Sequence, residues 1–496
     1  MPFFLLFAAA CNQSPSLPKQ HLRINIQNEP QTLDPRKARD LNAITVMHML
    51  FEGLTRVAKN GTVELALARD FEISKDGLRY LFHLRDARWS NGTPITSFDF
   101  SESWKKSLSP DFPSHTAYQL YPIKGAKETK QGTNCDLGIK PLDAETLLIE
   151  LEEPIPYFLE LLSTPAYFPV FRTDDDHWSE SVSTYVCNGP FALKRWEHSD
   201  QIELVRNPHY WNAEEVRLEQ LDLVMVSEET ELRMFSQGEL DWAGSPLSSL
   251  PPDAINSLKS EGSMHVKPLL GTYFLRVNTE DPALKDVSLR RALSAAINRS
   301  EIVDHILQGG QEIATSLVPP SLGLASNGSF PAGEVASGIT LTLLYQQNER
   351  NHLIAQTLQQ QVKNTLGINL VLEAVERKTL YERISKLDYQ LAAGSWIADY
   401  NDPINFLEVF KFKSASTNNT GWEDPKYVEW LWRSSVCRDS EERKVFLRNA
   451  EELLMSQMPI IPIFHYALNY LTRPEVEDVA LSSIGQVDFR WAHKKI

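Results

Sequence analysis

Short apolar runs set between polar residues predict most of the strands in the first half of the chain. They occur at residues 22–26, 71–73, 80–84, 191–196, 201–205 and 221–226. Two of these runs flank Lys75-Asp76-Gly77, whose glycine suits the turn of a hairpin. Apolar residues at helical spacing predict helices at 42–54, 97–108 and 228–237. This half of the chain is therefore expected to be α+β.

A different pattern, in which strands alternate with helices, begins after Gly271. Strands are predicted at 273–277, 339–345, 368–375 and 389–393, and helices at 288–298, 353–366 and 378–387. The last three strands and the two helices between them form a βαβαβ unit, which requires a parallel sheet with right-handed crossovers. Ligands of such sheets bind outside the carboxyl ends of the strands. Residues 394–401, directly after the last strand, are therefore expected at a binding edge.

The N-terminus carries an apolar run that predicts export. Residues 3–10 end in small residues directly before Cys11, and a polar segment follows. The run resembles a bacterial lipoprotein signal, which implies that the Cys11 thiol is acylated and tethers the protein to the membrane. A plain cleaved signal, or an apolar terminus with a free Cys11, is the alternative. We expect a location in the periplasm or on the outer face of the cytoplasmic membrane.

Composition and charge narrow the classes of function. A chain of 496 residues is expected to form two or three domains. Its 65 acidic and 49 basic residues give a formal charge of −16, which disfavours nucleic acid and suits a cationic or zwitterionic ligand. The cysteines and histidines show no metal-ligand spacing, so no metal or other cofactor is expected. Eleven Trp and fifteen Tyr supply flat, amphipathic surfaces suited to a ligand cleft.

Several ordered motifs carry a resemblance to a known family. The chain contains LARDFEIS at 67–74, YLFHLR at 80–85, WSNGTPIT at 89–96, NGPF at 188–191, NPHYW at 207–211, DVSLRRAL at 286–293 and WIADYNDP at 396–403. In this order and at about these spacings, they resemble the large solute-binding proteins of peptide ABC importers. The resemblance covers nearly the whole chain from residue 22.

The resemblance implies a two-lobed, hinged fold like that of the type II periplasmic binding proteins, with three domains of α/β and α+β structure. Domain I would comprise 21–51, 185–270 and 467–496, and domain II would be inserted at 52–184 to complete the first lobe. Domain III, at 271–466, would form the second lobe. The implied partners are short peptides and an ABC permease, and the protein is expected to act as a monomer. A ligand that contacts both lobes would stabilise the closed state.

The resemblance also implies residues for binding a peptide. The aspartate of the WIADY motif, Asp399, would hold the peptide's α-ammonium, because a buried cation must be paired. The backbone at 395–397 would pair with the ligand as an added strand. Arg350 and His352 are available for the peptide's carboxylate. The other residues expected in the cleft are Ser395, Trp396, Ile397, Tyr400, Asn401, Arg39, Leu41 and Tyr118.

The sequence departs from the best-known oligopeptide binders at a few positions. Arg377 stands where a pocket tryptophan is usual, and a buried Arg377 would favour an acidic group of the ligand. Ala393 stands where an arginine is usual. The cysteine pair within one lobe is replaced by Gly271 and Ile397.

Other functions stay open at this point. A receptor of the same fold could bind a specialised ligand, such as a murein peptide, a nickel complex, haem or a sugar. An exported chaperone-like protein could use the same cleft for unfolded segments. A secreted peptidase would need a nucleophile or a metal set, and the sequence shows neither. We therefore expect a binding protein and not an enzyme.

Overall fold

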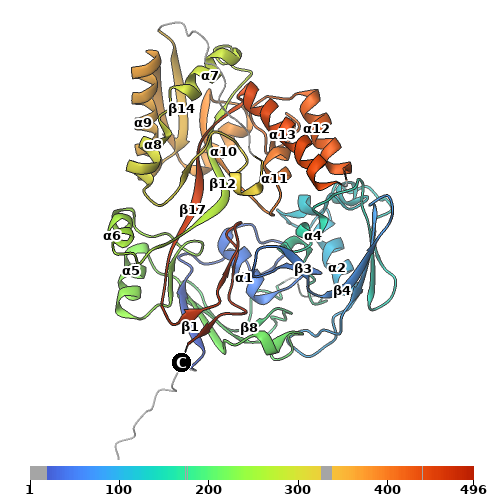
Figure 1. Ribbon diagram of the computed structural model, residues 1–496. Helices are drawn as coiled ribbons and strands as arrows, with labels where there is room; N and C mark the ends of the chain where they lie inside the picture. The colour runs from blue at the N-terminus through green and yellow to red at the C-terminus, as the bar shows by residue number, and fades with distance from the viewer. Residues whose placement is uncertain (1–18, 174, 176, 325–337, 438, 496) are drawn as a thin grey trace, which may run out of the picture.

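A computed structural model describes residues 19–173, 175, 177–324, 338–437 and 439–495; Cys11 lies outside them. The described chain forms two lobes, which are joined by two long strands (Figure 1). These strands, β12 (His265–Val277) and β17 (Ile460–Thr472), pair antiparallel and run from one lobe into the other. The expected two-lobed architecture of mixed α/β content is confirmed.

Lobe 1 contains the first half of the chain together with its C-terminal segment. In one sheet, β1 (His21–Asn25) pairs in parallel with β10 (Gln220–Val224) and β11 (Trp242–Gly244), and β9 (Gln201–Arg206) and β8 (Phe191–Glu197) extend it. A second sheet has the order β4 (Ala68–Ile73), β5 (Arg79–Leu84), β7 (Thr146–Glu150) and β6 (Ile139–Pro141). The helices include α1 (Leu41–Leu50), α2 (Ser97–Leu108) and α5 (Glu228–Gln237). The predicted hairpin and the predicted helices 97–108 and 228–237 are thus confirmed.

Lobe 2 contains the expected βαβαβ unit. Strand β14 (Thr340–Gln346) pairs in parallel with β15 (Asn369–Val375) and β16 (Leu391–Ile397). The connecting helices are α9 (Glu349–Leu366) and α10 (Arg377–Ser385). Helix α9 begins at the N-cap Asn348, whose side chain accepts from the Asn351 N–H, and ends at Gly367 with φ of 68°. The lobe also contains helices α7 (Val287–Ala295), α8 (Arg299–Glu301), α11 (Ile404–Leu407), α12 (Pro425–Val436) and α13 (Ser440–Gln457).

The predicted end of the last parallel strand was wrong by four residues. Strand β16 continues from Ala393 to Ile397, because residues 394–397 keep their antiparallel pairing with β12. Residues 394–397, which were expected to follow the strand, form its less buried end. Gly271 and Ile397 are direct register partners in this pairing. The strand therefore ends at Ile397, and the next N–H, that of Ala398, still donates to the Leu270 carbonyl (2.8 Å).

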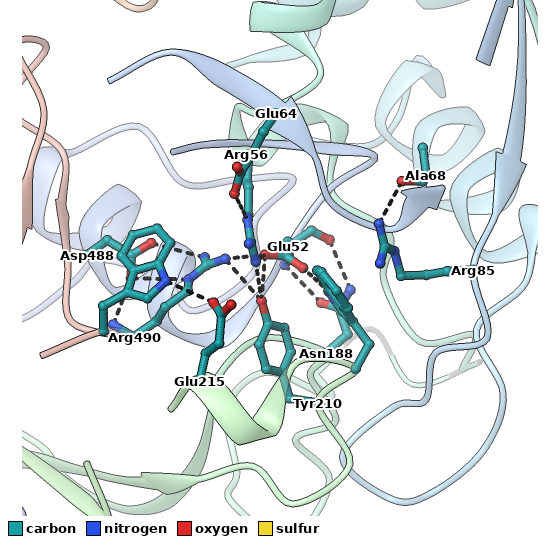
Figure 2. Close-up of polar contacts among 12 residues, drawn as sticks. Glu52, Arg56, Glu64, Ala68, Arg85, Asn188, Tyr210, Glu215, Asp488 and Arg490 are labelled. Atoms are coloured by element: carbon teal, nitrogen blue, oxygen red, sulfur yellow. Dashed lines mark hydrogen bonds and ion pairs between the residues drawn. The ribbon is translucent and has the colours of Figure 1, made fainter. Parts of the chain in front are cut away.

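A buried polar cluster ties together the distant segments of lobe 1 (Figure 2). Glu52, just after α1, pairs with Arg56 and Arg490 and accepts hydrogen bonds from Tyr210 Oη (2.8 Å) and Trp211 Nε1 (2.5 Å). The Asn188 side-chain amide hydrogen-bonds to the Glu52 backbone twice. It accepts from the Glu52 N–H (3.1 Å) and donates to the Glu52 carbonyl (2.9 Å). The first, middle and last parts of the chain thus meet at one carboxylate. We call these five side chains and Asn188 the Glu52 cluster.

No helix within the described residues has both the length and the apolar character needed to cross a membrane.

Candidate binding cleft

A cavity of about 820 Å³ opens between the two lobes. Lobe 1 contributes one face of α1, Gln119, residues 163–165 and parts of the segment 245–255 that follows β11. Lobe 2 contributes the first turn of α9, the end of β16, and Phe464 and residues 466–469 of β17. Residues of both lobes therefore line the cavity, and a ligand in it would contact both lobes.

Asp399 lies in this cavity, two residues beyond the end of β16. The side chain of Asn405 holds its loop, because Asn405 Oδ1 accepts from the Asp399 N–H (3.1 Å) and from Trp396 Nε1 (2.9 Å). The Asp399 side chain is exposed to the open cavity, and desolvation by the surrounding cavity walls raises its pKa to about 6, against a lowering by the hydrogen bond from Asn405. Among the described residues, no cation pairs with this carboxylate. Within the described part of the chain, the cavity thus holds an accessible acid without a counterion.

One edge of β16 is open next to Asp399. Strand β12 covers the other edge along the whole strand, whereas β14 pairs with β16 only at Leu391 and Ala392. Within the described chain, no strand pairs with the β14 side of β16 beyond Ala392. An extended ligand could therefore add to this edge through backbone hydrogen bonds, which do not depend on its side chains.

Arginines from both lobes line the cavity. Arg350 lies in the first turn of α9, and its charge acts on the Tyr466 hydroxyl, whose pKa burial raises to about 12. Arg39 lines the cavity from lobe 1, just before α1, together with Leu41. His352 does not line the cavity, because its Nδ1 is engaged with Tyr345 Oη at 2.7 Å. Of the two predicted carboxylate ligands, only Arg350 faces the cavity.

Of the predicted site residues, the structure brings together Asp399, Ile397, Arg39, Leu41 and Arg350 around the cavity. Three others lie close by without lining it. Tyr118 is half exposed, and its pKa is raised to about 12 by burial and then by the charge of Asp399, while its neighbour Gln119 lines the cavity. Ser395 is exposed on β16, and the indole of Trp396 is turned to Asn405.

Arg377 and the residues after Asp399 take other positions. Arg377 starts α10, is exposed, and its guanidinium lies 5.8 Å from the centre of the Tyr381 ring. It is not among the cavity-lining residues, so the condition of a buried Arg377 is not met. Tyr400 is buried against Tyr157 of lobe 1, with the rings stacked at 4.7 Å. Asn401 and Tyr400 line a small crevice beside the cavity.

Sequence reasoning missed several residues of the cavity. Beside the predicted Leu41, the face of α1 that points into the cavity carries Ile44, Thr45 and His48. Their spacing predicts that they share one face of a helix, but it does not predict what that face contacts. Asn405 has no signal in the sequence, since its role depends on the fold of the loop. The described residues contain no group of three or more His, Cys, Asp or Glu placed to hold a metal ion.

Comparisons with known proteins agree with this architecture. Residues 62–418 match the family of bacterial extracellular solute-binding proteins, family 5. The oligopeptide-binding protein OppA of Bacillus subtilis is 37% identical, over 96% of this chain and 93% of that protein. The structure of the Escherichia coli murein tripeptide binding protein MppA superposes with a TM-score of 0.81 at 27% identity, over 96% of this chain and 99% of that one. Haemophilus influenzae OppA, in complex with RPPGFSPFR, gives a TM-score of 0.79 at 26% identity, over 96% and 99%. The chain belongs to the family 5 bacterial extracellular solute-binding proteins.

Proposed function

We propose that this protein captures short peptides in the cavity between its lobes and delivers them to an ABC permease. The observation that carries the proposal is Asp399, an acid in a ligand-sized cavity for which the described protein supplies no cation. A free peptide brings an α-ammonium that pairs with such a group. The names of the relatives, which include oligopeptide-binding and murein tripeptide binding proteins, support the same ligand class.

The rest of the cavity accommodates the rest of a peptide. The open edge of β16 lies next to Asp399, so a peptide held there by its ammonium could continue as an added strand. Arg350, at the first turn of α9, is the residue we assign to the terminal carboxylate. Backbone pairing and two end charges would give binding that tolerates many side chains.

We further propose that the lobes move about β12 and β17, with domains at 21–51, 185–270 and 467–496 (I), 52–184 (II) and 271–466 (III). The ligand would stabilise the closed state because it contacts both lobes. The protein would act as a monomer in the periplasm or on the outer face of the cytoplasmic membrane. The apolar residues 3–10 directly before Cys11 support export and a lipid anchor at Cys11. Metabolic labelling with a fatty acid, lost in Cys11→Ser, would test the anchor.

Calorimetric titration tests the peptide proposal. The protein is first unfolded and refolded to remove any retained ligand, and it is then titrated with a mixed tripeptide pool and with the same pool N-acetylated. Binding of the free pool that is lost on acetylation would support recognition of the ammonium. Equal binding of both pools would remove the role of Asp399. Binding of neither would reject the proposal and favour a specialised ligand.

A further inference from the structure

Two polar residues of α1, Thr45 and His48, line the cavity although they are almost completely buried. Their exposed fractions are 2% and 8%. They lie three positions apart, which places them next to each other on one face of the helix. Leu41 and Ile44 complete the same face. We call Thr45 and His48 the α1 polar pair.

Neither side chain of the α1 polar pair hydrogen-bonds to another residue in the described part of the chain. The His48 ring packs edge to face on Phe168, with centroids 5.3 Å apart. Burial, and then the charge of Arg490, lower the pKa of His48 to about 3. The imidazole is therefore neutral at physiological pH and offers one donor and one acceptor.

Buried polar groups in folded proteins almost always have a hydrogen-bond partner. A polar group that lines a ligand cavity and lacks a partner in the protein can obtain one from the ligand. We infer that the α1 polar pair recognises an uncharged, hydrogen-bonding side chain of the bound peptide, which makes Thr45 and His48 specificity-determining residues. This inference rests on the proposed peptide-binding function and adds a side-chain preference to it.

The chemistry of the pair selects the class of side chain. The Thr45 hydroxyl and the neutral His48 ring can each donate and accept, which matches a carboxamide or a hydroxyl group. A cationic side chain fits poorly, because the positive charge of Arg490 already acts on His48. An aliphatic side chain would leave both groups unpaired, and sites built to hydrogen-bond a substrate group discriminate strongly against analogues that lack it.

The test uses an isosteric pair of side chains at each position of a tripeptide. Asn or Leu is placed in turn at each position of an otherwise alanine peptide, and Kd is measured by calorimetry for the full-length mature protein. For the wild type, we expect Asn to be preferred over Leu at one position by about tenfold, the order of one or two hydrogen bonds. His48→Leu should abolish or invert this ratio at that position only, and the isosteric Thr45→Val should reduce it.

His465 provides the matched control. It is also buried, at 4% exposed, and burial lowers its pKa to about 4, but its Nδ1 is engaged with Thr272 Oγ1 at 2.9 Å. His465→Leu should lower the melting temperature of the ligand-free protein and leave the Asn/Leu ratio unchanged. His48→Leu should leave the melting temperature equal or higher, because it removes an unpaired buried group.

The outcomes separate the inference from the function on which it rests. Peptide binding with the same Asn/Leu ratios in wild type, His48→Leu and Thr45→Val would overturn the inference and leave the proposed function intact. An equal loss of affinity for Asn and Leu peptides in His48→Leu would also overturn it, because His48 would then shape the cavity without selecting the side chain. Binding of no tripeptide by the wild type would overturn both.

Discussion

Two carboxylates, Glu52 in lobe 1 and Asp399 in the cavity, show how one chemical group serves two purposes. Burial raises the pKa of Glu52, but the charges of Arg490 and Arg56 outweigh this effect, and its pKa lies below the ordinary value. Desolvation also raises the pKa of Asp399. Only the hydrogen bond from Asn405 lowers it, so the pKa of Asp399 is about 6. The acid that the protein neutralises holds the fold together (Figure 2). Asp399, which has no cation partner among the residues that the structure describes, is available to a ligand.

The largest expected effect comes from breaking the Glu52 cluster. Arg490→Met removes the ion pairs to Glu52 (2.5 Å) and Asp488 (3.0 Å) and leaves both carboxylates buried. Loss of one partner of a buried pair costs about 3–5 kcal/mol, which denaturant unfolding would measure. The control is Lys59→Met, whose exposed pair with Asp478 is expected to contribute about 0.5 kcal/mol. Similar losses in both variants would contradict the difference between buried and exposed pairs.

Asp399→Asn should have the opposite profile, with a large loss of binding and no loss of stability. Removing one partner of a desolvated charge pair costs about 2 kcal/mol or more, so the Kd for a free tripeptide should rise at least about 30-fold. The melting temperature of the ligand-free protein should stay equal or rise. Asp402, three residues on, is the matched control because it already has a cation.

Asp402 forms two hydrogen bonds of 2.8 Å with Arg443. Asp402→Asn should therefore lower the melting temperature and retain most of the affinity for peptides. The reverse result, with stability lost at Asp399 and binding lost only at Asp402, would refute the assignment of the ammonium site.

The pH dependence of binding sharpens the comparison further. The ammonium requires ionised Asp399, whose pKa in the free protein is about 6. Affinity for free tripeptides should thus be flat above pH 6 and fall up to tenfold per pH unit below it. The pKa of Asp399 is higher in the folded protein than in the unfolded chain. The ligand-free protein should therefore lose stability as the pH rises from about 4 to 6 and Asp399 ionises. Calorimetric titration from pH 4.5 to 7.5 measures the pH dependence of the affinity. If Asp399→Asn shows the same pH dependence as the wild type, the prediction is contradicted.

The sequence predicts the architecture better than it predicts the cavity. The βαβαβ unit, the hairpin and the helix 97–108 follow from local periodicity, because their residues bury one face against a core. The motif WIADYNDP locates Asp399, but it does not indicate that Tyr400 turns away to the other lobe. Which groups lack a partner, such as His48, depends on contacts between segments far apart in the chain. No local pattern contains that information.

A smaller effect is expected where the lobes meet outside the ligand cavity. Tyr157 of lobe 1 stacks on Tyr400 and donates from Oη to Glu408 Oε1 (3.0 Å), and burial raises the pKa of Glu408. If lobe opening breaks this contact, Tyr157→Phe should destabilise the closed state and raise the Kd of every free tripeptide by about 3- to 10-fold, whatever its side chains. Tyr427→Phe is the control, since Tyr427 Oη donates to the Leu407 carbonyl (2.7 Å) within lobe 2 and should affect stability alone. Unchanged affinities in Tyr157→Phe would mean that the contact persists in the open state. Glu408 would then resemble Glu52, as an acid whose partner serves the fold and not the ligand.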